Sequence, residues 1–355
     1  MTIFDSVLTH AVSSGASDVY FLESVVPAVK VDGVVSPVPG ADTLDSDAMR
    51  AILERLLPVR ERAVFAERGE ANLSHMHPIL GRFRVNCYRA MSVSGAVLRR
   101  VKTEVPTLES LELPPVLGGL ALERQGLILL VGATGAGKST TVAAMLHHRI
   151  IQSHGHVVTI EDPVEFLHPS AQSIVSQREV GIDTESYEVG LRNALRQAPD
   201  VIFVGELRDP ETVAVALHSA ETGHLVISTL HATNATTAIE RVLNFFQPEV
   251  RSAMLLQLSL SMRAVVAQRL VPRGDGKGRA AAMEIMLVTP RIQALIRRGE
   301  LETIRQAVEE GTNEGLQTFD QALLDLLQRK IIGQEDAVRF ADSPNNLRLR
   351  MKGIR

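Results

Sequence analysis

The run Gly132-Ala133-Thr134-Gly135-Ala136-Gly137-Lys138-Ser139 decides the fold of this chain, because it matches the phosphate-binding pattern G-x-x-x-x-G-K-[ST]. Glycines let successive backbone N–H groups turn toward phosphate oxygens, where larger side chains would block the approach. Lys138 supplies a cation for the β and γ phosphates, and the hydroxyl of Ser139 is a ligand for Mg²⁺. We therefore predict that Gly132–Ser139 and Thr140 bind ATP, with Ser139 also binding Mg²⁺.

The segments on both sides of this loop support the prediction. Leu127–Val131 is a short, continuous apolar run, which is typical of a buried parallel strand, and Thr140–Arg149 suits a helix. Three similar runs follow, with helical segments between them: Val157–Ile160, Val201–Val204 and Leu225–Ser228. Apolar strands that alternate with helices predict an α/β fold with a parallel sheet.

The first hundred residues have a different pattern. Gly81–Tyr88 alternates apolar side chains with basic or polar ones, which predicts a half-buried strand, and Ala96–Val101 is its expected partner. Asp32–Gly33 is a hairpin-turn signal, and Asp45–Leu57 has apolar residues at helical spacing. These features predict a small α+β domain.

The chain of 355 residues is long enough for two domains. Pro106, Pro114 and Pro115, followed by Gly118–Gly119, interrupt regular structure between the two patterns. We therefore predict an α+β domain at residues 1–101, a linker at 102–119, and an α/β ATPase domain with C-terminal helices at 120–355.

Composition excludes several classes of function. A net charge of -4, with no run of five Lys or Arg, argues against a nucleic-acid partner. The single cysteine, Cys87, excludes an intramolecular disulfide and a Cys-rich zinc site. Met1–His10 has no basic region typical of a signal peptide, and the longest apolar runs are far below the roughly 20 residues that span a bilayer. We expect a cytoplasmic protein without a transmembrane segment.

Polar residues follow three of the apolar runs at the point where each strand should end. Glu161, Glu206 and His231 come after the second, third and fourth runs. Carboxyl ends of parallel strands meet at one edge of a sheet, so these side chains are expected near the glycine loop. A carboxylate of Glu161 or of the adjacent Asp162 could polarise an attacking water, and Glu206 could bind Mg²⁺ or its waters. Gly205 stands where a strand-ending Asp is usual, so Glu206 must supply the charge alone.

Structural roles for the same residues remain open at this point. Asp162-Pro163 can form an ordinary surface turn that carries Glu161 with it. An acid after the third run can cap the next helix, which suits Asp209 better than Glu206. For His231 the pattern leaves a γ-phosphate contact and a structural role about equally open.

Basic residues gather on or beside the paired strands of the first domain: Arg82, Arg84, Arg89, Arg99 and Arg100. In a ring of subunits, such arginines could reach a neighbour's nucleotide and neutralise charge on the γ-phosphate. The simpler interpretation is a solvated basic face.

Four segments in this order and spacing resemble the secretion-type ATPases of the type IV pilus, in particular the PilT/PilU retraction group. They are the glycine loop Gly132–Ser139, Thr159–Phe166, Val204–Asp209 and Thr222–His231. The resemblance covers nearly the whole chain. It implies a PAS-like first domain, a RecA-like second domain, and a homohexameric ring with ATP between subunits.

The resemblance also implies a role for each candidate residue. Glu161 would be the general base, Glu206 the Mg²⁺-associated acid, and His231 the γ-phosphate sensor. The arginines of Arg82–Arg100 would be fingers that act between domains or between subunits.

Two further segments sharpen the resemblance. Pro290–Gly299 is similar to the A-I-R-N-L-I-R-E motif of retraction ATPases, with Ala294 in place of Asn and Arg298 in place of the final Glu. The ending, at Gln317–Gln321 and Ala341–Leu349, looks closer to the PilU-type members than to the PilT-type members. Extension and type II secretion relatives usually carry a four-cysteine zinc module, which this chain lacks.

The function that follows is ATP hydrolysis at the cytoplasmic face of the inner membrane to power pilus retraction. The expected partners are an inner-membrane platform protein at the pilus base and a second, PilT-type retraction ATPase. Two alternatives stay open: a nucleic-acid or conjugation-type transfer ATPase on the same fold, and a regulatory subunit that binds ATP without useful turnover.

Overall fold

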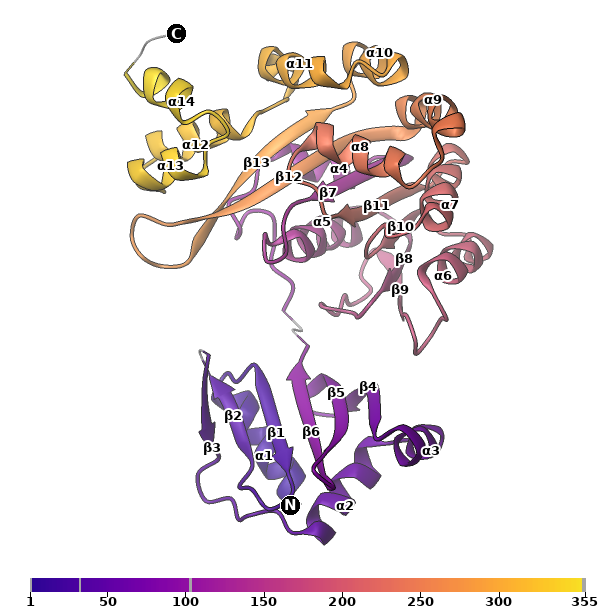
Figure 1. Cartoon of the computed structure of the whole chain (residues 1–355), viewed down its shortest axis with the longest axis vertical. Coiled ribbons are helices and arrows are strands. Elements are labelled where there is room, and N and C mark those ends of the chain that lie inside the picture. The colour runs from indigo at the N-terminus through magenta and orange to yellow at the C-terminus, as the bar shows by residue number, and fades with distance from the viewer. Residues whose placement is uncertain (1, 32, 102–103, 353–355) are drawn as a thin grey trace. The chain divides into compact units, whose positions relative to one another are not determined.

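The computed structural model describes residues 2–31, 33–101 and 104–352 (Figure 1). Asp32 of the expected hairpin turn and 102–103 of the expected linker lie outside the described residues. The chain divides into two compact units. The N-terminal unit is Met1–Glu104 with Glu165–Leu167, and the C-terminal unit is Val105–Val164 with His168–Arg355.

The N-terminal unit contains a six-stranded antiparallel sheet in the order β3-β2-β1-β6-β5-β4. Its strands are β1 Asp18–Leu22, β2 Ala28–Val31, β3 Val34–Pro37, β4 Glu70–His77, β5 Gly81–Ala90 and β6 Val93–Arg100, and its helices are α1 Ile3–Ser13, α2 Ser46–Leu56 and α3 Val59–Arg68. Phe4, Phe21 and Phe83 are among its fully buried side chains. The expected alternation of β5 is present, since Phe83, Val85 and Cys87 are buried.

The C-terminal unit contains a seven-stranded mixed sheet in the order β13-β12-β7-β11-β10-β8-β9. Only the β12–β13 pair is antiparallel among these described strands. The strands are β7 Gly126–Val131, β8 Gly155–Glu161, β9 Ser173–Glu179, β10 Val201–Val204, β11 Leu225–Leu230, β12 Met262–Pro272 and β13 Arg279–Leu287. Strands β9, β12 and β13 were not expected from the sequence, because charged and polar side chains interrupt their apolar runs.

Helices cover both faces of this sheet, as Figure 1 shows. Leu129 of β7 is buried in a cluster with α6, α7 and α8, whereas its neighbour Leu130 is buried in another with α4 and α5. Such burial on both faces explains the continuous apolar runs. The helices of this unit are α4 Val116–Ala121, α5 Lys138–Gln152, α6 Tyr187–Ala194, α7 Pro210–Glu221, α8 Ala235–Asn244, α9 Arg251–Ser261, α10 Pro290–Arg298, α11 Ile304–Glu310, α12 Phe319–Gln328, α13 Gln334–Phe340 and α14 Pro344–Met351. Its described residues also form the short 3-10 turns η1 Leu195–Gln197, η2 Pro248–Val250, η3 Leu301–Thr303 and η4 Thr312–Glu314. None of the described helices is long and apolar enough to cross a membrane.

One buried carboxyl group joins the edge hairpin to α8. Glu284 of β13 is 6% exposed, and its Oε1 accepts a hydrogen bond of 2.7 Å from the backbone N–H of Ala235. Burial raises the pKa of Glu284 to about 7; Asp342 adds to this rise, while the Ala235 N–H, Arg269 and Arg305 oppose it. Glu284 is therefore protonated more readily in the folded chain than in the unfolded chain.

The stability of the protein should fall as Glu284 ionises. Its pKa of about 7 lies above its ordinary value of 4.5, so the folded state binds more protons between these two values. Stability is lost as pH rises through this window, by about 3 kcal/mol at most. Glu284→Gln keeps the acceptor for Ala235 and removes the ionisation. Calorimetric melting at pH 5, 6, 7 and 8 should show wild type losing stability relative to this variant; parallel curves would contradict the assignment.

Candidate active site

The glycine loop joins β7 to α5 and packs against β12. A Cβ added to Gly132 would lie 2.7 Å from the carbonyl oxygen of Gln268, and one added to Gly137 would lie 2.8 Å from the Gln268 amide nitrogen. The hydroxyl of Thr141 in α5 donates a buried hydrogen bond of 2.7 Å to Gln268 Oε1. Gln268 therefore holds the start of the loop and the first turn of α5 together. Sequence analysis missed this residue, because its proximity depends on the unexpected strand β12.

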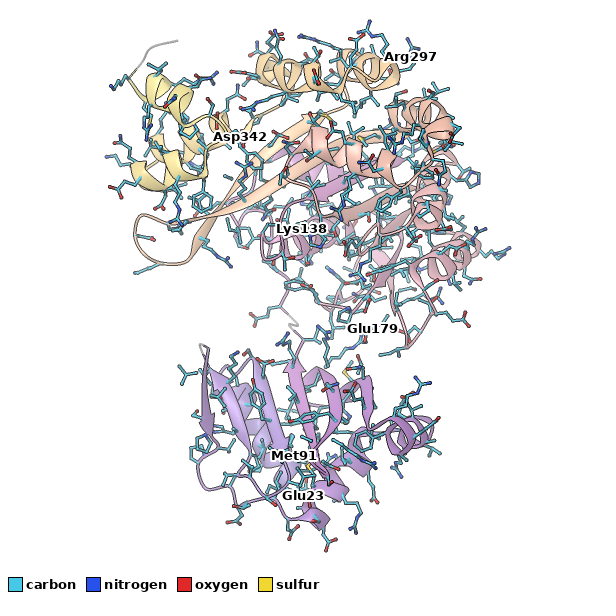
Figure 2. All side chains as sticks on the ribbon, in the orientation of Figure 1. Glu23, Met91, Lys138, Glu179, Arg297 and Asp342 are labelled. Atoms are coloured by element: carbon cyan, nitrogen blue, oxygen red, sulfur yellow. The ribbon has the colours of Figure 1, made fainter. Side chains whose placement is uncertain are left out.

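Lys138 is the first residue of α5, and Figure 2 labels it there. Its Nζ donates hydrogen bonds to the carbonyl oxygens of Gly132, at 2.8 Å, and Ala133, at 3.0 Å. The ammonium group is thereby held over the loop. Ser139 and Thr140 follow in the first helical turn, where backbone N–H groups point out of the helix. The loop thus presents a cation and the N-terminal backbone donors of α5 at one place, which suits a phosphate ligand.

Strand register brings the predicted polar residues to the same edge of the sheet. Leu230 of β11 lies opposite Val131 of β7, so His231 and Gly132 leave the two strands at the same level. On the other side of β11, Val204 of β10 lies opposite Ser228 and also opposite Ile160 of β8. Glu161, Glu206 and His231 therefore all lie at the edge that carries the glycine loop.

Glu206 is the centre of a charged cluster. Its side chain is 15% exposed; Oε2 accepts a hydrogen bond of 2.8 Å from Arg208 Nε, and Oε1 lies 3.4 Å from His231 Nε2. Arg208 also lies 3.5 Å from Asp162 Oδ2. The hydrogen bond to Glu206 raises the pKa of Arg208 above its ordinary value. Glu206 and His231, predicted from separate strands, thus face each other, and Arg208 joins them to the end of β8.

Glu161 is the last residue of β8 and is 7% exposed. Its Oε1 accepts hydrogen bonds from the hydroxyl of Thr159, at 2.7 Å, and from the amide of Gln177 on β9, at 3.1 Å. Two donors on one oxygen fix the orientation of the carboxylate. Gln177 could not be found from the sequence, because β9 has no clear apolar pattern.

Asp209 serves the helix that follows β10. Its side chain accepts a hydrogen bond of 2.7 Å from the backbone N–H of Thr212 and one of 3.0 Å from the Thr212 hydroxyl. It is therefore the N-cap of α7, with Pro210 as the first helical residue. Of the two acids after β10, Glu206 is the one that faces the charged cluster.

The five predicted arginines lie in the N-terminal unit, whereas the loop, acids and histidine lie in the C-terminal unit. Arg99 donates a hydrogen bond of 2.7 Å to Asp18. Burial opposes ionisation of Asp18, but hydrogen bonds from Arg99 and Ser17 outweigh it, so the pKa of Asp18 is lowered. Arg99 therefore stabilises its own unit.

The remaining arginines differ in how they are held. Arg82 donates a hydrogen bond of 2.9 Å to the Ser74 hydroxyl. Arg89 lies with its guanidinium 5.4 Å from the centre of the Phe65 ring. Arg84 lies opposite Arg99 in the β5–β6 pair, and Arg100 lies opposite Phe83.

Comparisons with known proteins give one consistent result. The profile of the family described as "Type II/IV secretion system protein" matches residues 1–332. The chain is 46% identical to the "Type IV pilus ATPase PilU" of Pseudomonas aeruginosa, over 98% of this chain and 91% of that protein. It is 39% identical to the "Type IV pilus retractation ATPase PilT" of the same organism, over 96% of this chain and 98% of that protein.

A solved structure is similar over nearly the whole chain. The crystal structure of the pilus retraction motor PilT with bound ADP has a TM-score of 0.90 and 35% identity, covering 98% of this chain and 99% of that one. The fold class expected from the sequence is confirmed, as is the resemblance to the retraction group. The nucleic-acid alternative is not favoured.

Gly132→Ala should weaken nucleotide binding, because the new methyl group would meet the carbonyl of Gln268, which is held in the sheet by the pairing of β12 with β13. Fluorescent ATP-analogue titration should show at least a tenfold loss of affinity. Gly40→Ala is the control: Gly40 has φ +72 with no atom within 4 Å of an added Cβ, so it adds backbone strain of about 1–2 kcal/mol without a clash. Equal affinities for the two variants would contradict the proposed packing of the loop.

Proposed function

Because this chain belongs to the type II/IV secretion system protein family, we propose that it is a PilU-type ATPase that powers type IV pilus retraction as a homohexameric ring. The observation that carries the proposal is the convergence of Glu161, Glu206 and His231 on the edge of the sheet that bears the glycine loop. The names of the PilU and PilT relatives and the ADP bound to the PilT structure support ATP as the substrate.

The triphosphate binds along Gly132–Ser139 and the start of α5. Backbone N–H groups of the loop and of the first helical turn donate to its oxygens, and Lys138 contacts the β and γ phosphates. Gln268 keeps the loop in its binding conformation through the contacts with Gly132, Gly137 and Thr141. The ADP bound to the similar PilT structure supports a nucleotide as the ligand.

Magnesium fits the donors at this edge. Among the residues that the structure describes, no group of three or more His, Cys, Asp or Glu side chains could hold a metal ion. Magnesium commonly takes one or two protein oxygens, together with waters and substrate phosphates. Ser139 would supply its hydroxyl directly, and Glu206, whose oxygens face Arg208 and His231, would act through water. The ion would neutralise charge on the phosphates.

Glu161 acts as the general base. The carboxylate is held by Thr159 and Gln177, so it is oriented before the substrate binds. It takes a proton from a water molecule as the water oxygen attacks the γ-phosphorus. The bond between the γ-phosphorus and the bridging oxygen breaks, and the products are ADP and phosphate.

Two further contacts serve the γ-phosphate. His231 leaves β11 beside Gly132 and senses this phosphate, with Glu206 orienting its ring. An arginine from the N-terminal unit neutralises the charge that develops during transfer. Arg99 is bound to Asp18, Arg89 stacks on Phe65 and Arg82 donates to Ser74. Arg84 and Arg100 are therefore the better candidates.

The same proposal places the ring at the cytoplasmic face of the inner membrane. Its partners there are the platform protein at the pilus base and a PilT-type retraction ATPase. This placement rests on the PilU and PilT relatives.

Lys138→Ala and Glu161→Gln separate binding from chemistry. The first removes the cation of the loop and should lose nucleotide affinity by at least tenfold. The second keeps the shape of the side chain but not the base; it should bind ATP normally and turn over at least 100-fold more slowly, as general-base loss typically costs. Equilibrium ATP binding and steady-state phosphate release measure the two effects. Normal turnover by Glu161→Gln would remove Glu161 from the proposed mechanism.

The retraction role is tested in twitching cells that lack their own retraction ATPases. Cells that receive this protein with a PilT-type partner should retract pili with more force than cells with the partner alone. Glu161→Gln should abolish the gain while the variant protein accumulates normally. An unchanged force in optical-trap measurements would contradict the retraction proposal and leave the ATPase assignment intact.

A further inference from the structure

Gly205 breaks the usual pattern of an apolar strand that ends in Asp and a second acid. The backbone of Gly205 is fixed on both sides: its N–H donates to Ile160 O at 2.8 Å, and its carbonyl accepts from the Thr229 hydroxyl at 2.6 Å. These bonds tie it to β8 and β11. A side chain at this position would therefore have a fixed direction and little freedom to avoid its neighbours.

Tyr187 occupies the space into which a side chain at position 205 would point. A Cβ added there would lie 2.9 Å from the hydroxyl oxygen of Tyr187 and 3.3 Å from its ring. The first distance is shorter than real Cβ contacts, so an Asp could not be accommodated without moving the tyrosine. The hydroxyl of Tyr187 thus lies 2.9 Å from the point where an Asp side chain at position 205 would begin.

Tyr187 is held firmly in this position. It is the first residue of α6, which Ser186 caps by accepting from the N–H of Val189 at 3.1 Å. One turn later, Gly190 brings the helix so close to β8 that an added Cβ would lie 2.9 Å from the side chain of Ile160. The tyrosine side chain is 8% exposed. The backbone of Tyr187 can therefore withdraw from Gly205 only if the helix moves with it.

Four charged groups face the phenol. Arg208 lies with its guanidinium 5.8 Å from the ring centre. Burial is the main cause of a raised pKa of Tyr187, and the carboxylates of Asp162, Glu206 and Glu161 raise it further, while Arg208 opposes them. The hydroxyl therefore remains protonated at neutral pH and can donate a hydrogen bond beside carboxylates that can only accept.

We propose that Tyr187 is a positioning residue for ATP hydrolysis, whose hydroxyl replaces the missing strand-ending acid beside Gly205 and orients the water held between Glu161 and Glu206. The proposal rests on the roles given above to these two acids. An Asp at 205 would add a negative charge to the cluster, whereas the tyrosine adds a neutral donor. Arg208, which stacks on the ring and binds Glu206, keeps the second acid aligned with it.

Tyr187→Phe is the first test, because it removes the donor and keeps the ring under Arg208. The kcat of the full-length protein with saturating Mg-ATP should fall about tenfold, the effect of one hydrogen bond near charged groups. The KM for ATP should stay within twofold and the melting temperature should be unchanged. An unchanged kcat would overturn the proposal. So would a loss of kcat accompanied by equal losses of nucleotide affinity and thermal stability, which indicates a packing role.

A double-mutant cycle with Gly205→Ala is the second test. The added methyl group should displace the hydroxyl, so Gly205→Ala alone should lower kcat about as much as Tyr187→Phe. In the Tyr187→Phe background, the same change should cost at most twofold more, because the displaced group is already absent. Gly119→Ala is the control, since an added Cβ there meets no atom within 4 Å, and it should leave kcat unchanged.

The cycle distinguishes this proposal from the general mechanism. If the two single losses multiply in the double variant, Gly205 and Tyr187 act independently and the proposal fails. Glu161→Gln, measured in the same assay, reports on the general base by itself. Normal turnover by that variant would overturn the role of Glu161, whereas a coupled cycle at 187 and 205 would still place Tyr187 in the catalytic cluster.

Discussion

The backbone register of four adjacent parallel strands is the constraint on which the rest of the site depends. Strands β7 and β11 are paired so that they end opposite each other, at Val131 and Leu230, and the neighbouring β10 ends opposite Ser228 of β11 and Ile160 of β8, at nearly the same level. Side chains that are up to about a hundred residues apart in the chain therefore emerge at one edge. Hydrogen bonds along each pair fix this level, so no side-chain contact is needed to bring Glu161 and His231 to the glycine loop. The charged cluster then sets only their fine orientation.

The parts of this arrangement that could be predicted are those determined by the residue pattern within one short segment. Leu127–Val131 and the other continuous apolar runs indicate strands because both faces of the sheet are covered. The glycine loop is recognised from its own residues, because Gly132–Ser139 matches a phosphate-binding pattern. Once these strands are assumed parallel, Glu161, Glu206 and His231 follow from their places after the runs.

The parts that could not be predicted depend on pairing across long stretches of chain. Gln268 and Gln177 lie on β12 and β9, two strands that the sequence does not predict because polar residues interrupt their apolar pattern. Each glutamine reaches the site only because its strand pairs with a predicted strand, β7 or β8. From the sequence alone, Tyr187 is predicted only as one position on the apolar face of a helix. Its role near Gly205 becomes visible only when α6 is seen to pack closely on β8 at Gly190. Gly205 was the local signal in the sequence. The residue that fills the space in front of it, Tyr187, belongs to another segment of the chain.

Strand β12 gives the nucleotide loop a direct connection to the C-terminal helices. Gln268 contacts the loop, and the next residue, Arg269, holds α12 and α13. Arg269 donates to Phe340 O at 2.8 Å, pairs with Asp342 at 2.7 Å, and places its guanidinium 3.8 Å from the centre of the Phe319 ring (Asp342 is labelled in Figure 2). Because β12 is hydrogen-bonded to β7 on one side and β13 on the other, these two residues cannot move separately along the sheet. Any shift of β12 relative to β7 would displace the loop contact and the helix contacts together, so α12 and α13 are mechanically joined to the glycine loop.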